Sequence, residues 1–126
     1  ITVSAEAFAL AAGRETRKGD PIAIAELAGI MSAKRTSDLI PLCHPLPLSS
    51  VTVAITPDAD TSSLNVSATA KTNGKTGGEM EALTAASFAC LTLYDMLIAV
   101  DKGMVSGGIE LAEKSGGASG DYRKSD

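Results

Sequence analysis

The sequence predicts an α+β fold of the ferredoxin-like kind, in which helices pack on one face of an antiparallel sheet. Its segments follow the order strand, two helices, strand, strand, helix, strand, and a split βαβ repeat of this order is the ferredoxin-like plan. With 126 residues and 44% apolar residues, the chain is long and apolar enough for one buried core, built mainly from aliphatic side chains. We see no internal repeat and no second domain, so residues 1–126 are expected to form a single domain.

The N-terminal third predicts a short strand and two helices. The β-branched residues 1–4 are typical of a strand, and Ser4 is well placed to cap the Ala-rich helix that follows. Asp20 and Pro21 then begin a second helix, in which apolar residues recur at helical spacing. Gly29 lies inside that helix at a cost of about 1 kcal/mol relative to Ala. Such a glycine indicates close packing against another backbone.

The rest of the chain predicts a rigid loop, a hairpin, a long helix and a last strand. Three prolines in residues 39–48 remove backbone donors, so this apolar segment is neither a helix nor a central strand and needs somewhere to be buried. Residues 50–56 and 64–72 alternate like the strands of an antiparallel hairpin. The longest helix is expected at residues 79–102, apolar on several faces and therefore heavily buried, as an oligomer would allow. A last short strand is expected at residues 108–112.

Composition argues against several classes of protein. A net charge of −4 and an aromatic content of 3% disfavour nucleic-acid binding. No run of 18 apolar residues is present, so no membrane span is expected. Cys43 and Cys90 form no CxxC pair and His44 is the only histidine, so we expect no protein-held metal. Two thiols without a secretory signal fit a reducing cytoplasm.

The chain opens at Ile1, inside an expected strand and without Met, so we expect an N-terminal segment to be missing.

Two segments in the first half of the chain could contribute to a site. Lys18 lies just ahead of a helix N-terminus, where anions bind, but a solvated lysine in a turn is the simpler reading. Lys34 and Arg35 end a helix beside the proline-braced Cys43 and His44, which is a stronger signal because rigid support is what a binding group needs. Adjacent residues of an extended segment point in opposite directions, so this Cys and His are not a nucleophile pair.

Two further segments carry carboxylates or a lysine among glycines. Residues 74–85 look like a phosphate loop but fail the Walker pattern. Glu79 and Glu81 point to nearly opposite sides of a helix, so one faces a pocket while the other pairs elsewhere or caps the helix. Asp95, fourteen residues after Glu81, returns to within about 40° of the same face, and a structural role explains it as well as a catalytic one. Lys114 stands among glycines whose backbone donors can approach a ligand, although a flexible tail explains it too.

The chain resembles the cyclic pyranopterin monophosphate synthases, the MoaC family, in four segments: KGDPIAIAELAGIMSAKRTSDLIPLCHPLPL, GKTGGEMEALTAASFACLTLYDM, DKGMV and KSGGASGDY. They cover most of residues 18–122, and AKRTSDLIPLCHPL and EMEALTAAS are highly specific strings. The resemblance implies a ferredoxin-like fold and a homo-hexamer, built as a trimer of dimers with each active site at a dimer interface. It implies a lyase of molybdenum cofactor (molybdopterin) biosynthesis. Such an enzyme converts (8S)-3′,8-cyclo-7,8-dihydroguanosine 5′-triphosphate to cyclic pyranopterin monophosphate and releases pyrophosphate.

The resemblance also implies roles for individual residues. It makes Lys18 a catalytic lysine and Asp95 the acidic active-site residue. It gives substrate contacts to Leu42, Cys43, His44, Met80, Glu81, Lys34, Glu79, Lys75 and Lys114. A triphosphate that loses pyrophosphate needs cations, and the rebuilding of a purine as a pterin needs proton transfers, which Lys and Asp can supply. No cofactor bound by the protein is expected, and any Mg²⁺ would arrive with the triphosphate.

One position departs from the family. Members carry YDMCKA where this chain has YDMLIA, so Ile98 replaces a lysine regarded as catalytic. Lys102, one turn further on, lies about 20° from Asp95 on a helical wheel and could partly reach the vacant place. Two functional readings follow: an enzyme of this pathway, or an impaired or non-catalytic paralogue that binds a purine nucleotide or pterin intermediate. The other pocket residues are present, which favours the enzyme.

Overall fold

An antiparallel hairpin is the longest extended part of the fold. In the computed structural model, which describes residues 1–73, 77–116 and 120–125, it consists of β1 (Leu48–Asp58) and β2 (Ser63–Thr72). The register places Ile55 opposite Val66. Alternation along β1 buries Val53 and Ile55 on one face and exposes Thr52, Ala54 and Thr56 on the other. The predicted hairpin is confirmed.

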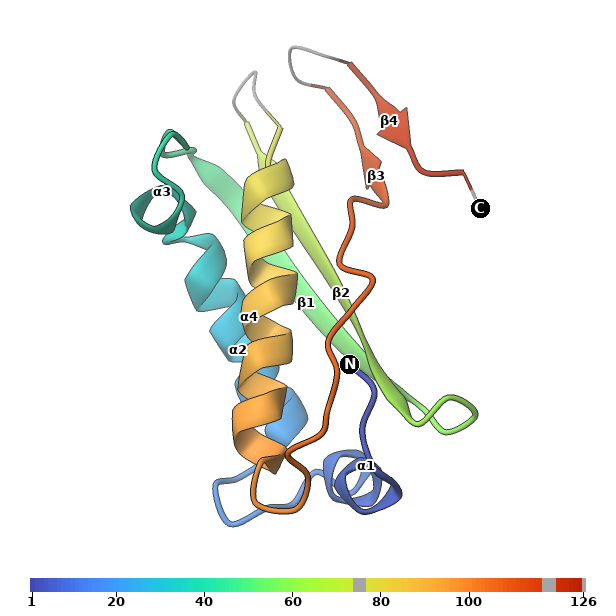
Figure 1. Ribbon diagram of the computed structural model, residues 1–126. Helices are drawn as coiled ribbons and strands as arrows, with labels where there is room; N and C mark the ends of the chain where they lie inside the picture. The colour runs from blue at the N-terminus through green and yellow to red at the C-terminus, as the bar shows by residue number, and fades with distance from the viewer. Residues whose placement is uncertain (74–76, 117–119, 126) are drawn as a thin grey trace.

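Two long helices cover one face of this hairpin (Figure 1). They are α2 (Pro21–Ala33) and α4 (Glu79–Leu97), which also pack against each other. A Cβ at Gly29 of α2 would lie 2.9 Å from the Ala85 carbonyl oxygen and 3.0 Å from Val53 Cγ2. The close backbone contact predicted at this glycine is therefore confirmed. No helix in the described part of the chain is long and apolar enough to cross a membrane.

Two short helices flank the long ones. They are α1 (Ala5–Ala12) and α3 (Thr36–Leu39). Ser4 caps α1 and Asp20 caps α2, each by accepting backbone N–H groups of the first turn. Both caps are the ones that the sequence predicts, because capping depends on residues within three positions of one another.

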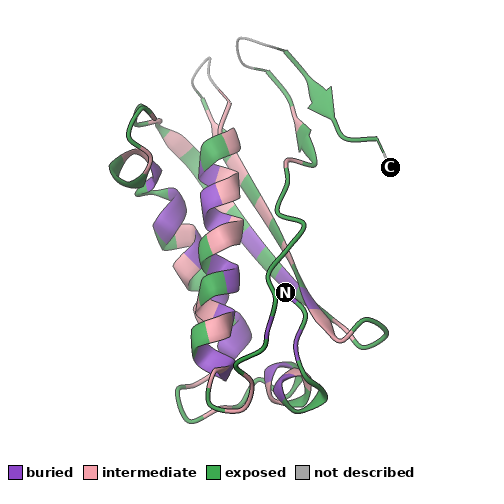
Figure 2. Ribbon diagram, viewed as in Figure 1, coloured by how far each residue is buried: buried purple, intermediate pink, exposed green. Residues whose placement is uncertain are grey.

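The core lies between the two long helices and the hairpin. Figure 2 shows buried residues on both helices and both strands. Side chains with no exposed surface lie on α2 (Ala25), on β2 (Leu64) and on α4 (Ala85, Ala89 and Leu93), while Val53 and Ile55 of β1 are each 7% exposed. The predicted aliphatic core is confirmed.

The N-terminal segment extends the sheet through one bridge residue rather than through a full strand. Thr2 pairs antiparallel with both Ser63 and Val105, and its N–H donates to the Val105 carbonyl at 2.8 Å. The order of pairing is therefore residue 105, residue 2, β2 and β1, with every pair antiparallel. The α+β architecture, with helices packed on an antiparallel sheet, is confirmed. The ferredoxin-like topology stays a prediction, which this order of pairing supports.

The long helix ends earlier than the sequence predicts. It ends at Leu97 rather than at residue 102, and residues 98–100 form a turn. The Asp101 carboxylate accepts the N–H groups of Ser4 and Gly103, each at 2.8 Å. The bond from Ser4 holds residue 101 at the start of α1, so a contact between distant segments stands where the last turn of helix was predicted.

The strand predicted at residues 108–112 is wrong. Pairing with Thr2 falls at Val105, and Gly108 then adopts a φ of 64°, outside the extended range. Residues 106–116 and 120–125, here called the C-terminal arm, include β3 (Glu113–Lys114) paired with β4 (Tyr122–Arg123). The end of the arm extends away from the helices (Figure 1).

Candidate active site

The residues predicted to form the site fall at the two ends of α4. Asp95 lies near the C-terminal end with Lys18, and Glu81 lies near the N-terminal end with Lys34. Asp95 comes fourteen positions after Glu81 on this helix, which corresponds to about 21 Å along the axis. A single chain therefore holds two clusters, here called the Lys18 cluster (Lys18, Asp95) and the Lys34 cluster (Lys34, Glu81).

In the Lys18 cluster, the two residues predicted to be catalytic are in contact. Lys18 Nζ donates to the backbone oxygen of Asp95 at 2.9 Å and lies 3.5 Å from Asp95 Oδ1. Asp95 is among the last four residues of α4, whose carbonyl groups have no partner within the helix. The ammonium group thus caps the negative end of the helix dipole. Both side chains remain half exposed or more, at 50% and 70%, so both are open to a ligand.

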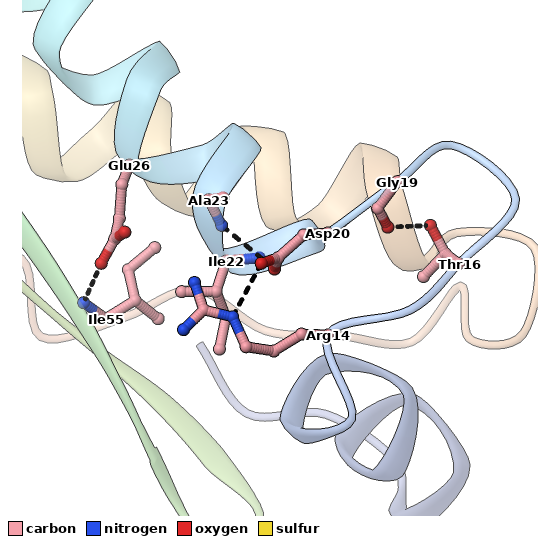
Figure 3. A network of polar contacts seen from close by, with 8 residues as sticks. All are labelled: Arg14, Thr16, Gly19, Asp20, Ile22, Ala23, Glu26 and Ile55. Atoms are coloured by element: carbon pink, nitrogen blue, oxygen red, sulfur yellow. Dashed lines mark hydrogen bonds and ion pairs between the residues drawn. The ribbon is translucent and has the colours of Figure 1, made fainter.

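The loop that carries Lys18 is attached to α2 by a second set of contacts (Figure 3). Asp20 Oδ1 accepts from the N–H groups of Ile22 and Ala23, while its Oδ2 accepts from Arg14 Nε at 2.7 Å. Burial raises the pKa of Asp20, but the hydrogen bonds from Ala23, Arg14 and Ile22 outweigh it, so the pKa lies below 3.8. Asp20 is therefore both the helix cap and the anchor of the loop.

The Lys34 cluster lines a hollow of about 250 Å³. Its walls come from the end of α2, from α3, from residues 45–48 and from the first turn of α4. Glu81 is only 3% exposed, whereas Lys34 is exposed at the C-cap of α2. A buried carboxylate beside an exposed cation gives this hollow both acceptor and donor groups for a polar ligand.

The proline-rich loop lies beside this hollow, but in a single chain it is largely exposed. Leu42 is 93% exposed and His44 is exposed, so the burial expected for this loop is not found within one chain. Cys43 is partly buried. Burial, and next the charge of Glu81, raise the pKa of the Cys43 thiol above 9.0. A raised pKa disfavours the thiolate, which is the nucleophilic form of a cysteine.

Glu79 and Glu81 point to different surroundings, as the sequence predicts. Glu79 lies 3.6 Å from Lys114 Nζ of the C-terminal arm, a side chain that is only 11% exposed. Met80 between them is 38% exposed. The remaining predicted contact, Lys75, lies outside the described residues.

The suggestion that Lys102 stands near Asp95 on one helix face is wrong. It requires helix as far as residue 102, but α4 ends at Leu97. The backbone carbonyl of Lys102 instead accepts from the Tyr94 hydroxyl at 2.6 Å, and its side chain is exposed. Ile98, at the C-cap of α4, is partly buried.

Sequence reasoning missed two residues that shape the Lys18 loop. Arg14 holds Asp20 from a left-handed backbone conformation (φ 59°), and Thr16 closes the turn that carries Lys18. Spacing alone does not reveal either contact, because exposed Arg and Thr residues are common in any loop. In the described part of the chain, no three His, Cys, Asp or Glu side chains gather as metal ligands would.

A family model described as the MoaC family matches residues 1–117. Similar proteins named cyclic pyranopterin monophosphate synthase occur in several bacteria. The protein from Brucella ovis is 56% identical over 126 residues, covering 100% of this chain and 76% of its own length. The protein from Cereibacter sphaeroides (strain ATCC 17029) is 54% identical over 125 residues (99% and 79%), and that from Dinoroseobacter shibae is 53% identical over 122 residues (97% and 77%). With a family model that matches most of its residues and relatives of this identity along its length, the chain belongs to the MoaC family.

Proposed function

We propose that this chain is a cyclic pyranopterin monophosphate synthase of molybdenum cofactor biosynthesis. It would convert 3′,8-cyclised dihydro-GTP to cyclic pyranopterin monophosphate and release pyrophosphate. The observation that carries this proposal is the contact between Lys18 and Asp95, 77 residues apart in sequence. These are the two residues to which the resemblance assigns catalysis.

The chemistry of the two clusters suits this reaction. An ammonium group and a carboxylate 3.5 Å apart can give and take protons, as the rebuilding of a purine ring into a pterin requires. Lys34 beside the hollow, and Lys114 next to Glu79, are cations that could meet phosphate groups. We expect no cofactor on protein ligands, and any Mg²⁺ would arrive on the triphosphate.

We further propose that the complete site combines two protomers. The Lys18 and Lys34 clusters of one chain are about 21 Å apart along α4, too far to hold one nucleotide-sized substrate in contact with both. In a two-fold dimer, the Lys18 cluster of one protomer can face the Lys34 cluster of its partner. Apolar side chains exposed on the helices supply a surface for such a contact: Leu27, Met31, Phe88 and Leu91. We expect these dimers to assemble into a hexamer, a trimer of dimers.

The cellular setting follows from the same proposal. A GTP-derived substrate and two unpaired cysteines fit the cytoplasm, where thiols stay reduced. The partner we expect is the small-molecule substrate, with neither nucleic acid nor membrane.

Ile98 favours a second candidate, a paralogue that binds the substrate without converting it. A hydrocarbon side chain neither moves a proton nor binds phosphate. It stands one turn after Asp95, where the family carries a lysine. In the described residues, the cation bonded at Asp95 is Lys18.

One experiment separates the two candidates. Turnover of the cyclised GTP substrate is measured by mass spectrometry as pterin product and pyrophosphate, for the chain as written and for Ile98→Lys. Product from the chain as written supports the synthase. Tight substrate binding without product, together with activity in Ile98→Lys, supports the binding paralogue. No binding and no product from either protein would reject both.

A further inference from the structure

The turn that carries Lys18 is held by the side chain of Thr16. Backbone bonds join Thr16 and Gly19 in both directions, at 3.0 and 3.1 Å. The Thr16 hydroxyl adds two more, because it donates to the Gly19 carbonyl at 2.8 Å and accepts the N–H of Lys18 at 3.2 Å. Figure 3 shows the first of these hydroxyl bonds. One hydroxyl group thus fixes the main chain on both sides of the Lys18 side chain.

Apart from the two backbone bonds, few contacts stabilise this turn. Arg17 and Lys18 are exposed, so the turn has almost no apolar burial to stabilise it. In such a turn, bonds from a side chain to the backbone decide the conformation. Gly19 has a φ of 118°, which an L side chain rarely adopts, so the turn also depends on glycine at that position.

The Lys18 turn is attached to the rest of the molecule through Asp20. The Arg14–Asp20 ion pair lies on either side of it in sequence, and Asp20 is bonded to the first turn of α2. The path from the α2 N-terminus to the Lys18 ammonium group is therefore bonded at each step. It ends on the carbonyl oxygen of Asp95.

We propose that Thr16 is a positioning residue for Lys18: its hydroxyl fixes the turn that holds the ammonium group on Asp95. This inference rests on the proposed function, in which Lys18 acts on the substrate. Thr16 itself need not touch substrate. Its hydroxyl acts on the backbone at Lys18 and Gly19, and loss of that hydroxyl would leave Lys18 free to sample other positions.

The test compares Thr16→Val, which removes the hydroxyl at nearly constant shape, with Thr16→Ser, which keeps it. In the full chain, Thr16→Val should lower kcat by about tenfold with little change in KM, because misplacement of a catalytic group affects the transition state more than binding. Thr16→Ser should retain most of the activity. In a Lys18→Ala background, Thr16→Val should have no further effect, since the two residues act as a unit.

A second measurement needs no turnover, so it decides about Thr16 even if the proposed reaction fails. Trace labelling with acetic anhydride, read by mass spectrometry, compares the reactivity of Lys18 with that of the exposed Lys102. We expect Thr16→Val to change this ratio of reactivities by about fivefold, which is the change in an equilibrium constant that the free energy of one net hydrogen bond produces. Thr16→Ser should leave the ratio unchanged.

Thr61→Val is the matched control, because Thr61 is an exposed threonine at the tip of the β1–β2 hairpin. It should alter neither kcat nor the labelling ratio. Equal labelling of Lys18 in Thr16→Val and the unmodified chain would overturn the proposal. So would unchanged kcat in an active protein, or the same loss in Thr61→Val.

Discussion

Lys18 bonds the main-chain oxygen of Asp95 more closely than its carboxylate, at 2.9 Å against 3.5 Å. The contact therefore does two separable things. The bond to the carbonyl caps α4, while the carboxylate, 70% exposed, remains open to a ligand. This geometry is the basis of the first prediction.

Asp95→Asn should abolish most turnover and leave the fold intact. The substitution keeps the carbonyl that Lys18 caps and removes only the carboxylate, so we expect kcat to fall by at least about 100-fold. The melting temperature should change little, because an exposed ion pair contributes at most about 1 kcal/mol. Lys18→Ala should lose activity and also lower the melting temperature, since it removes the cap. Equal melting temperatures in the two variants would contradict the capping role.

A mixture of two inactive variants should recover activity if the site is shared between protomers. Lys18→Ala disables one end of α4 and Glu81→Gln the other. In a randomly mixed two-fold dimer, half of the dimers are mixed and each has one intact site, so about a quarter of the full activity should return. The variants are unfolded together, refolded and assayed for product. Each variant refolded alone is the control, and no gain on mixing would place the whole site within one chain.

Gly29→Ala should destabilise the protein even though alanine is the better helix former. Helix propensity alone would stabilise the variant by about 1 kcal/mol. The new Cβ would lie 2.9 Å from the Ala85 carbonyl oxygen, so α2 and α4 must move apart, at a cost of about 1 to 3 kcal/mol.

Denaturant unfolding measures the free energy of unfolding of Gly29→Ala, with Ala23→Gly on the exposed side of α2 as the control. The free energy of unfolding of the control should fall by about 1 kcal/mol, because glycine has the lower helix propensity. A more stable Gly29→Ala variant would show that the contact is not tight.

Asp101 should make the protein more sensitive to acid. Hydrogen bonds from the N–H groups of Ser4 and Gly103 lower the pKa of Asp101 below 3.8 in the folded state. Because the pKa of Asp101 is lower in the folded state than in the unfolded state, the ionised carboxylate stabilises the folded protein. This stabilisation is present above pH 3.8 and is lost as the pH falls through the lower pKa of the folded state.

The check is the melting temperature of the unmodified chain and of Asp101→Asn as a function of pH. The unmodified chain should be the more stable at pH 7, and the difference should shrink below pH 3.8. A difference that stays constant with pH would mean that the Asp101 charge is not involved.

The sequence by itself determined the elements whose signals are local. Ser4 and Asp20 begin their helices, and alternation along residues 50–56 and 64–72 specifies the hairpin, because capping and pleating depend on near neighbours. The site residues were predicted by another route, from the strings that resemble the MoaC family. Lys18 and Asp95 could be chosen from sequence, but their contact could not be derived from spacing.

Tertiary structure decided the features that depend on distant segments. Helix α4 ends at Leu97, and the Asp101 carboxylate beyond it accepts the N–H of Ser4. The pairing with Thr2 falls at Val105 rather than at residues 108–112. The placement of the Lys18 and Lys34 clusters at opposite ends of α4 also appears only in the folded chain. Each of these outcomes involves contacts between residues far apart in sequence. A local sequence pattern carries no information about such contacts.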